Sequence, residues 1–268
     1  MTRNRCEAFH DLHQSGCFVI PNPWDVGSAR VLAQLGFPAL ATTSSGFAWS
    51  QGKCDNAVPL DEAIEHFRTI AAAVDIPLNG DFEGGFAIEP AGVAANVARA
   101  IATGIAGISL EDSTGDPSNP LFDFDLSVER MRAARAAIDQ SGRRTVLTGR
   151  SEGFITGRPD LQETIRRLTA YADAGADCLY APGIRSHQDI AAVVNAVAPK
   201  PVNVLVGSDF ATVAELAALG VRRISVGGAL ARAAWTGFLG AAIEIARHGT
   251  FNGLAAAVPF ADLNKRFQ

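Results

Sequence analysis

Paired cysteines, basic runs and an uninterrupted apolar segment are all missing from this sequence. Its four cysteines are scattered over 268 residues, without the short spacing of a zinc site or a redox dithiol. The first five residues lead into no apolar signal core. These absences argue against a zinc site or a secreted disulfide framework, and we expect a protein of the reduced cytoplasm.

The charge pattern does not indicate a basic surface for nucleic-acid binding. The net charge is −5, the isoelectric point is near 5.5, and no stretch interleaves basic with aromatic residues. The apolar stretch from Gly227 to Ile245 is interrupted by Arg232 and by glycines, which predicts a packed helix rather than a membrane span. We therefore expect a small-molecule ligand, and neither nucleic acid nor a membrane as a partner.

Eight short apolar runs recur along the chain, and each is followed by a helical pattern. With 48% hydrophobic residues the chain can bury one large core. An open doubly wound sheet shares this alternation, but no Gly-x-Gly-x-x-Gly turn follows the first run. We predict an α/β fold, a (β/α)8 TIM-type barrel, as a single domain over residues 1–268. The predicted strands are Phe18–Ile20, Pro38–Thr42, Ile76–Gly80, Ala106–Leu110, Arg144–Thr148, Ala176–Tyr180, Pro201–Leu205 and Arg222–Val226.

A C-terminal appendage, Phe251–Gln268, follows the eighth unit. It carries several large apolar residues, among them Phe260 and Leu263. Such a segment has to pack either on its own barrel or on a neighbouring subunit. Association into a homo-oligomer is therefore expected.

Acidic residues follow three successive predicted strands. Asp81 and Glu83 come after the third strand, Glu111 after the fourth and Glu152 after the fifth. Because the C-terminal ends of barrel strands meet at one mouth, these carboxylates should converge there. Oxygen ligands without a nearby His or Cys favour magnesium, or manganese, over zinc. The alternative is that they are ordinary solvated loop acids.

Arg150 ends the fifth predicted strand, beside these acids. Its planar guanidinium suits a bidentate grip on the acid group of a substrate. The alternative is a structural ion pair of Arg150 with Glu152 or Glu111.

Two polar segments complete the predicted mouth. Thr42–Gly46 offers hydroxyls, including those of Thr43 and Ser45, and accessible backbone N–H groups that could hold an enolate oxygen, although it also fits a simple polar loop. Ser113–Pro120 is rich in turn formers and predicts a mobile lid over the mouth.

In combination, several motifs resemble the isocitrate lyase/phosphoenolpyruvate mutase superfamily, in the same order over nearly the whole chain. They are Pro21–Asp25, Thr42–Gly46, Asp81–Phe86, Leu110–Ser113, Gly149–Glu152 and Pro201–Leu205. The resemblance implies a barrel whose eighth helix is swapped between subunits of a dimer or tetramer. It also implies a magnesium-dependent enzyme that makes or breaks C–C or C–P bonds beside an α-oxo acid, through a pyruvate-type enolate.

The resemblance also implies roles for individual residues. Asp81 matches the direct metal ligand, and the acids that hold the metal through water match Asp55, Glu83 and Glu111. The segment that binds the enolate oxygen and the carboxylate matches Ser45, Gly46 and Phe47. Arg150 matches the arginine on the substrate's acid group. Apart from the resemblance, the residue that transfers the proton could be Glu83 or a residue of the lid.

The lid departs from the family's patterns, and the departure narrows the reaction. Isocitrate and methylisocitrate lyases carry a Lys-Lys-Cys-Gly-His loop, whereas Ser113–Pro120 holds no Cys, Lys or His. Mutase lids carry a lysine and an asparagine; Asn119 has the asparagine's spacing, but Pro117 stands at the lysine's place. We therefore expect a lyase or hydrolase that cleaves a C–C bond in a small α-oxo or 2-hydroxy diacid, such as oxaloacetate or an alkylmalate. The alternatives are a C–P bond enzyme of the phosphonopyruvate or carboxyphosphonoenolpyruvate type and a non-catalytic acid-binding barrel.

Overall fold

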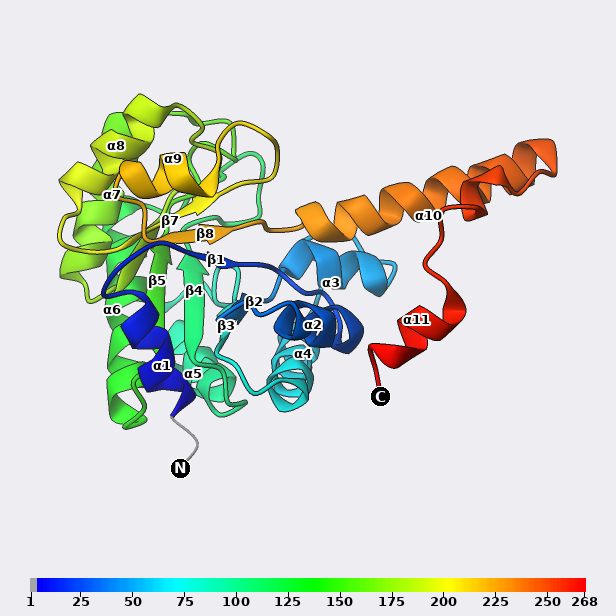
Figure 1. Cartoon of the computed structure of the whole chain (residues 1–268). Coiled ribbons are helices and arrows are strands. Elements are labelled where there is room, and N and C mark those ends of the chain that lie inside the picture. Colours follow the sequence, from blue (N-terminus) through cyan, green and yellow to red (C-terminus); the bar gives the residue numbers. More distant parts are fainter. Residues whose placement is uncertain (1–3) are drawn as a thin grey trace.

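Eight parallel strands surround one axis in the computed structural model, which describes residues 4–268, and the helices lie outside them (Figure 1). Residues 1–3, the start of the segment in which we expected no apolar signal core, lie outside the described residues. Strands β2 to β8 pair in sequence order and β8 pairs with β1. The ring is nearly closed, and at its seam the Ala41 N–H donates to the Pro21 carbonyl at 3.1 Å. The predicted (β/α)8 barrel is confirmed.

All eight predicted strands are present, within two residues of their expected bounds. They are β1 Phe18–Ile20, β2 Leu40–Ala41, β3 Leu78–Asp81, β4 Gly107–Glu111, β5 Val146–Arg150, β6 Cys178–Tyr180, β7 Val202–Leu205 and β8 Arg223–Ser225. Three strands run one or two residues further than predicted, because Asp81 pairs in register with Ser109, and Glu111 with Arg150. The polar residues expected just after these strands are therefore their last residues.

The helices cover the outside of the barrel and close one end of it. They are α1 Arg5–Leu12, α2 Val26–Gln34, α3 Ser44–Ser50, α4 Leu60–Ala73, α5 Pro90–Ile101, α6 Phe124–Gln140, α7 Leu161–Asp173, α8 His187–Ala196, α9 Val213–Ala218, α10 Ala229–His248 and α11 Phe260–Lys265, with a short 3-10 helix, η1, at Asn252–Leu254. Helix α1 closes the N-terminal end, where Phe9 packs with Phe18, Val146 and Cys178. The opposite end of the barrel, at the strand C-termini, is not closed by α1 and can hold a binding site.

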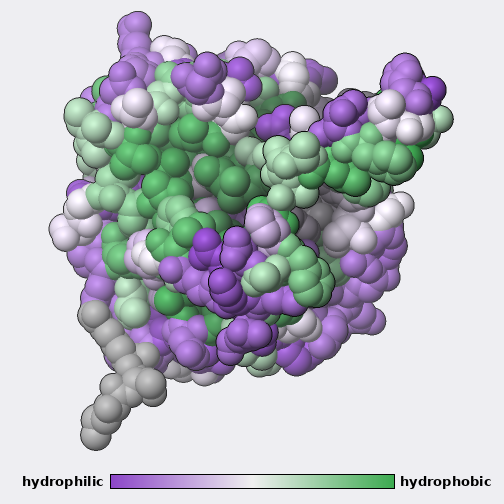
Figure 2. Space-filling view, turned by 45° about the vertical axis from the view of Figure 1, so that its right-hand side comes forward, coloured by the Kyte–Doolittle hydropathy of each residue, from purple (hydrophilic) through white to green (hydrophobic). Residues whose placement is uncertain are grey.

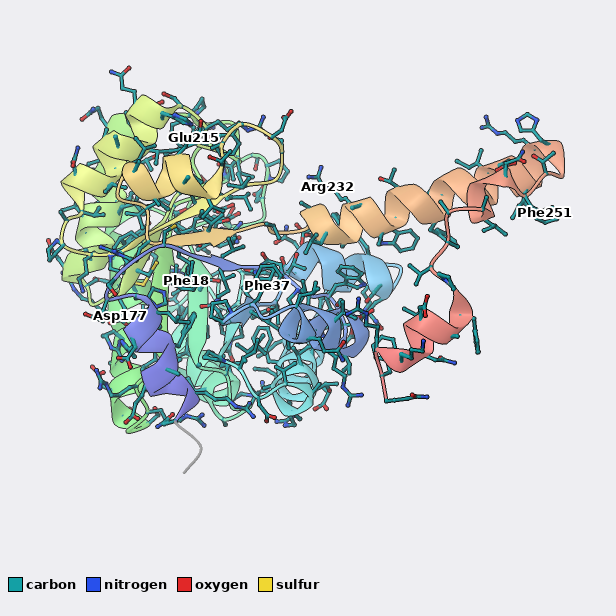
Figure 3. All side chains as sticks on the ribbon, viewed as in Figure 1. Phe18, Phe37, Asp177, Glu215, Arg232 and Phe251 are labelled. Carbon is teal, nitrogen blue, oxygen red and sulfur yellow. The ribbon has the colours of Figure 1, made fainter. Side chains whose placement is uncertain are left out.

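Helix α10 leaves the barrel after its first turn (Figures 1 and 3). Only Ala231 is buried along its length, and Figure 2 shows apolar surface along the projecting segment. The prediction of a packed helix is therefore wrong within one copy of the chain. By length and composition alone, α10 is also the one helix in residues 4–268 that could cross a membrane. The large exposed apolar residues of α10 and the following segment include Trp235, Phe238, Leu239, Ile243, Phe251, Leu254, Val258, Phe260 and Leu263.

A single asparagine after β1 joins three strand ends. The Asn22 side-chain amide donates to the Thr42 carbonyl at 2.9 Å, and its Oδ1 accepts the N–H groups of Val226 and Gly227, each at 2.9 Å. The side chain is 5% exposed. These bonds link the segments after β1, β2 and β8, beside the seam of the barrel.

We predict that Asn22→Ala lowers the free energy of unfolding by about 2–4 kcal/mol, because it leaves buried backbone groups without partners. Urea unfolding of the variant measures the loss. Asn195→Ala, at an exposed position of α8, is the matched control and should change stability by less than about 0.5 kcal/mol. Equal stability of the two variants would contradict the assigned role of Asn22.

Candidate active site

A cavity of about 310 Å³ opens at the C-terminal ends of the strands and reaches down the barrel axis. Seven of the predicted site residues line it, from five segments of the chain. They are Thr43, Ser45, Asp55, Asp81, Glu83, Glu111 and Arg150. The expected convergence of strand-end residues on one mouth is thus present in the structure.

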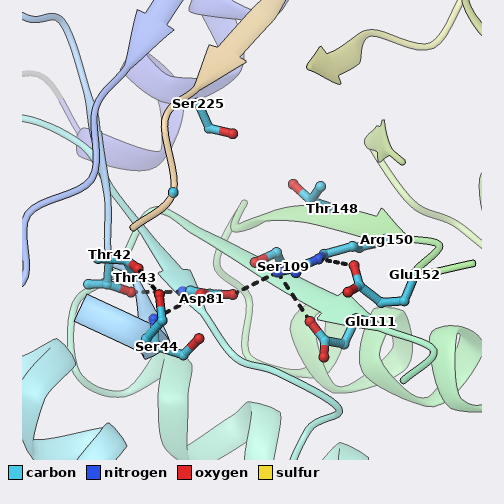
Figure 4. Close-up of polar contacts among 12 residues, drawn as sticks. Thr42, Thr43, Ser44, Asp81, Ser109, Glu111, Thr148, Arg150, Glu152 and Ser225 are labelled. Atoms are coloured by element: carbon cyan, nitrogen blue, oxygen red, sulfur yellow. Dashed lines mark hydrogen bonds and ion pairs between the residues drawn. The ribbon is translucent and has the colours of Figure 1, made fainter. Parts of the chain in front are cut away.

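Arg150 is the centre of this site (Figure 4). Its Nη1 lies 3.1 Å from Glu111 Oε2 and 3.3 Å from Asp81 Oδ1, and its Nε donates to Glu152. The ion pairs considered as the structural alternative are therefore both present. Burial by itself would lower the pKa of Arg150, but the charges of Glu111 and Glu152 outweigh it and hold that pKa well above its usual value. The guanidinium thus stays charged among acids that orient it.

Asp81 is fixed by the loop that follows β2. Its Oδ2 accepts the Ser44 N–H at 2.9 Å, and its own N–H donates to Thr42 Oγ1 at 2.8 Å. Because Asp81 is the last residue of β3, its carboxylate faces the mouth beside Arg150 (Figure 4). The polar segment Thr42–Gly46 therefore positions an acid, a role that sequence reasoning did not assign to it.

The acids around Arg150 are crowded and poorly hydrated. Burial, with the charges of Asp81 and Asp55, raises the pKa of Glu83 to about 8. Burial also raises the pKa of Glu111 well above its usual value, and burial and Asp81 raise that of Asp55. Glu83 has a φ of +46°, a strained conformation for a residue other than glycine, while its carbonyl accepts the Glu111 N–H at 3.0 Å. The mouth therefore holds more carboxyl groups than Arg150 can pair with, and the raised pKa values favour their neutral forms.

This donor set fits a hard divalent cation. The carboxylates offer only oxygen ligands, and a cation would relieve the repulsion that raises their pKa values. Within residues 4–268, no three His, Cys, Asp or Glu side chains are grouped closely enough to hold one ion together. The arrangement therefore suits an ion held directly by one carboxylate, with water between it and the other acids.

The predicted enolate-binding segment forms the first turn of α3. Thr43 caps this helix, and its Oγ1 lies 3.1 Å from Ser45 Oγ at the cavity wall. Gly46 is buried, and a Cβ there would lie 2.7 Å from Thr43 Cγ2 and 3.0 Å from Trp24 Cβ, so close packing requires glycine. The Gly46 N–H donates to Thr43 Oγ1 at 3.3 Å. Thr43 and Ser45 thus face the cavity, while Gly46 lies behind them.

Two other predicted residues lie outside the cavity lining. Phe47 stacks on His66 with ring centroids 3.9 Å apart, and its N–H already donates to the Thr43 carbonyl. Asn119 lies on the exposed lid, where its N–H donates to Asp116 and its carbonyl accepts the Thr114 hydroxyl. Their roles toward a substrate stay predictions.

Asp112 supports the site from behind. Its Oδ1 accepts the Glu152 N–H at 2.8 Å, and its Oδ2 accepts from Tyr171 at 2.7 Å and from Arg167 at 3.1 Å. Asp112 is 2% exposed. It fixes the backbone of Glu152, which in turn orients Arg150. The sequence placed Asp112 beside Glu111, but successive strand residues point to opposite faces, and this separates their roles.

Sequence reasoning missed a second polar layer, deeper in the barrel. It comprises Asn79, Ser109, Thr148, Asn203, Arg223 and Ser225, all of them buried. The available signal was the alternation of a strand, since Asn79, Ser109 and Thr148 each stand two residues before a predicted mouth residue. Tyr180 was also left unplaced; its ring lies 5.2 Å from the Arg150 guanidinium carbon.

His13 lies at the floor of this layer. Its Nδ1 is 2.7 Å from the Phe9 carbonyl and its Nε2 is 3.3 Å from Arg223 Nη1. Burial and the charge of Arg223 lower the pKa of His13 to about 3, from 6.5. The folded chain therefore keeps His13 neutral where the unfolded chain would protonate it.

We predict that the contribution of His13 to the free energy of unfolding falls as the pH drops below 6.5, because the unfolded state then binds a proton that the folded state excludes down to about pH 3. The raised pKa of Glu83 acts in the opposite direction, because its carboxyl group binds a proton in the folded state first. His13 should contribute a loss of about 2 kcal/mol at pH 5 and none above pH 7. Urea unfolding from pH 8 to pH 5 measures the slope. His13→Gln should lack this loss, so its stability relative to the wild type should rise by about 2 kcal/mol from pH 8 to pH 5. His187→Gln, at an exposed position of α8, should follow the wild type, and equal slopes in both variants would refute the assignment.

Comparison with known proteins gives the site its context. A family model described as phosphoenolpyruvate phosphomutase matches residues 9–246. A crystal structure from Burkholderia cenocepacia J2315, assigned as a candidate lyase/mutase, is 50% identical, with a TM-score of 0.95 over 98% of this chain and 96% of that one. The match therefore covers the barrel, the mouth and the appendage.

Two more distant relatives have stated activities. The oxaloacetate decarboxylase of Rhodopseudomonas palustris BisB5 is 30% identical over 95% of this chain and 90% of its own length. The structure of a phosphonopyruvate hydrolase in complex with oxalate and Mg²⁺ is 27% identical, with a TM-score of 0.85 over 98% of this chain and 95% of that one. The first of these enzymes is named for the decarboxylation of oxaloacetate and the second for the hydrolysis of phosphonopyruvate.

Proposed function

Because the chain belongs to the phosphoenolpyruvate phosphomutase family, we propose that it is a magnesium-dependent lyase or hydrolase of small α-oxo or 2-hydroxy diacids. The observation that carries the proposal is the cluster of Asp81, Glu111 and Glu152 around Arg150 at the barrel mouth. An arginine oriented on three sides by acids suits the recognition of a substrate's acid group. The surplus of carboxylates suits a divalent cation beside it.

Asp81 would hold the cation directly, and Asp55, Glu83 and Glu111 would hold it through water. When bound, Mg²⁺ supplies positive charge that stabilises the enolate oxygen left by bond cleavage. Arg150 binds the acid group, and the hydroxyls of Thr43 and Ser45 line the wall toward the same space. These contacts orient the substrate so that the broken bond leaves its electrons beside the carbonyl.

Glu83 is the proposed proton carrier. Burial and the charges of Asp81 and Asp55 raise its pKa to about 8 in the metal-free chain. A bound cation would lower that pKa, so the carboxyl group can exchange a proton near neutral pH. It can therefore protonate the enolate carbon and release pyruvate as the keto acid. Asn119 would reach the substrate only if the lid, Ser113–Pro120, moved toward the mouth, and this movement is part of the proposal.

Cleavage of a C–C bond is our first candidate reaction, and cleavage of a C–P bond is the second. The lid sequence favours the first, since Pro117 replaces the lysine of mutase lids and no cysteine is present in Ser113–Pro120. The similarity to the R. palustris decarboxylase supports C–C chemistry, while the similarity to the phosphonopyruvate hydrolase supports the alternative.

Pyruvate release tests the proposal. The enzyme is assayed with oxaloacetate, phosphonopyruvate and 2-alkylmalates, with and without Mg²⁺, against enzyme-free blanks that correct for spontaneous decay. We expect magnesium-dependent turnover of a C–C substrate, and a fall in kcat/KM of at least about 100-fold in Asp81→Asn and Arg150→Lys. The control Asp173→Asn, exposed at the end of α7, should keep full activity. Turnover unaffected by Mg²⁺ removal and by Asp81→Asn would contradict the metal role.

We also propose that the single domain, residues 1–268, works as a homo-dimer or homo-tetramer in which α10 and the C-terminal appendage pack on a second copy. Phe238 is 60% exposed and Phe260 81% exposed in one chain, and water contact of such large side chains is unfavourable. Sedimentation equilibrium is expected to give a dimer or tetramer. Phe238→Asp together with Phe260→Asp should lower the mass to that of the monomer; a wild-type monomer at micromolar concentration would refute the assembly.

The cellular location stays a proposal too. All four cysteines, Cys6, Cys17, Cys54 and Cys178, are free thiols in the structure. Free thiols agree with the reduced cytoplasm that we propose for this chain.

A further inference from the structure

Arg223, in β8, lies at the floor of the cavity and is 3% exposed. Its Nε donates to Asn203 Oδ1 at 2.9 Å, and its Nη2 donates to Thr148 Oγ1 at 3.0 Å. Its Nη1 lies 3.3 Å from His13 Nε2. All of these partners are uncharged acceptors. A guanidinium carries five N–H groups, so three contacts leave donors to spare.

The charge of Arg223 is not balanced inside the chain. In residues 4–268 no carboxylate lies within ion-pair distance of it. Two titratable side chains that feel its charge are neutral at physiological pH: burial lowers the pKa of His13 to about 3, and burial raises that of the Cys178 thiol. Burying a guanidinium without a counter-ion is unfavourable. An anion that enters the cavity would supply the missing negative charge.

The cavity gives an anion access to this position. Its lining runs from Arg150 at the mouth to Arg223, and its lower wall is polar, with Ser109, Asn203 and Ser225. Thr148, which Arg223 contacts, stands two residues before Arg150 on β5, so the two guanidinium layers are roughly 7 Å apart along the strand. That separation is comparable to the length of a short diacid.

We propose that Arg223 forms a second carboxylate subsite, which binds the far end of the diacid whose α-oxo acid end lies at Arg150. This inference rests on the proposed function and deepens it, since it makes Arg223 the residue that selects diacids over monoacids. A carboxylate held by a buried guanidinium is stabilised as an anion and is a poor source of CO2. The subsite therefore favours substrates whose far carboxylate stays in a product over simple decarboxylation.

A purely structural role is the competing explanation. Through His13, Arg223 also touches the segment that follows α1, and it could serve only to join that segment to the barrel. The two roles differ in one observable quantity. A tether affects all ligands equally, whereas a subsite affects only those with a second carboxylate.

Binding calorimetry with matched acids separates the roles. The two acids of each pair have the same number of carbon atoms and differ in their terminal group: 2-oxoglutarate with 2-oxopentanoate, and 2-oxoadipate with 2-oxohexanoate. In the presence of Mg²⁺ we expect the wild-type chain to bind the diacid of at least one pair about tenfold or more tighter, as a charged hydrogen bond provides. Equal affinities within both pairs would overturn the proposal.

Variants then assign the preference to Arg223. Arg223→Met should abolish the diacid preference and leave monoacid affinity within about threefold, while Arg222→Met, the neighbour that donates to the Gly16 carbonyl on the outside, should retain it. Equal weakening of diacid and monoacid binding by Arg223→Met would show that Arg223 is only a structural tether and would overturn the subsite.

If Arg223→Met does not fold, Arg223→Lys serves instead. A reduced diacid preference in Arg223→Lys supports the subsite, because lysine lacks the planar two-pronged guanidinium, and an unchanged preference contradicts it. Calorimetry measures binding independently of turnover. A diacid preference in calorimetry, combined with no pyruvate release in the activity assay, would therefore refute the proposed lyase but support the subsite.

Discussion

The concentration of carboxylates around one guanidinium at the strand C-termini is the constraint on which the rest of the structure depends. Arg150 contacts Asp81, Glu111 and Glu152 together, each from a different strand end. Burial, and to a lesser extent the charge of Asp81, raises the pKa values of Glu83 and Glu111. A site of this kind is stable only when each group is fixed and when a positive partner enters.

Several residues outside the substrate space hold these groups in place. The Thr42 side chain and the Ser44 amide hold Asp81, and buried Asp112 holds the backbone of Glu152. Asn22 ties together the strand ends beside the seam. The mouth is therefore assembled by hydrogen bonds between consecutive βα segments, which is why a barrel with parallel strands can hold so many like charges in one place.

Local patterns of the sequence were enough to predict the strands and the mouth. Asp81, Glu111 and Arg150 could be placed because each ends an apolar run, and parallel strands bring their ends together. The surroundings of Phe47 and the floor position of Arg223 could not be predicted, because they depend on contacts between residues far apart in the chain, which leave no periodic signal. For α10, local patterns predicted a packed helix, whereas the resemblance implied a helix swapped between subunits, which fits its exposure in one chain.

The central claim is that the mouth stabilises an enolate beside a carbonyl, and proton exchange tests it most directly. Pyruvate is incubated with the enzyme and Mg²⁺ in D2O, and its methyl signal is followed by NMR. The account predicts loss of methyl protons to deuterium well above the enzyme-free rate, abolished by chelation of Mg²⁺ and by Glu83→Gln. Exchange no faster than the enzyme-free rate, from a protein shown by calorimetry to bind both pyruvate and Mg²⁺, would contradict it.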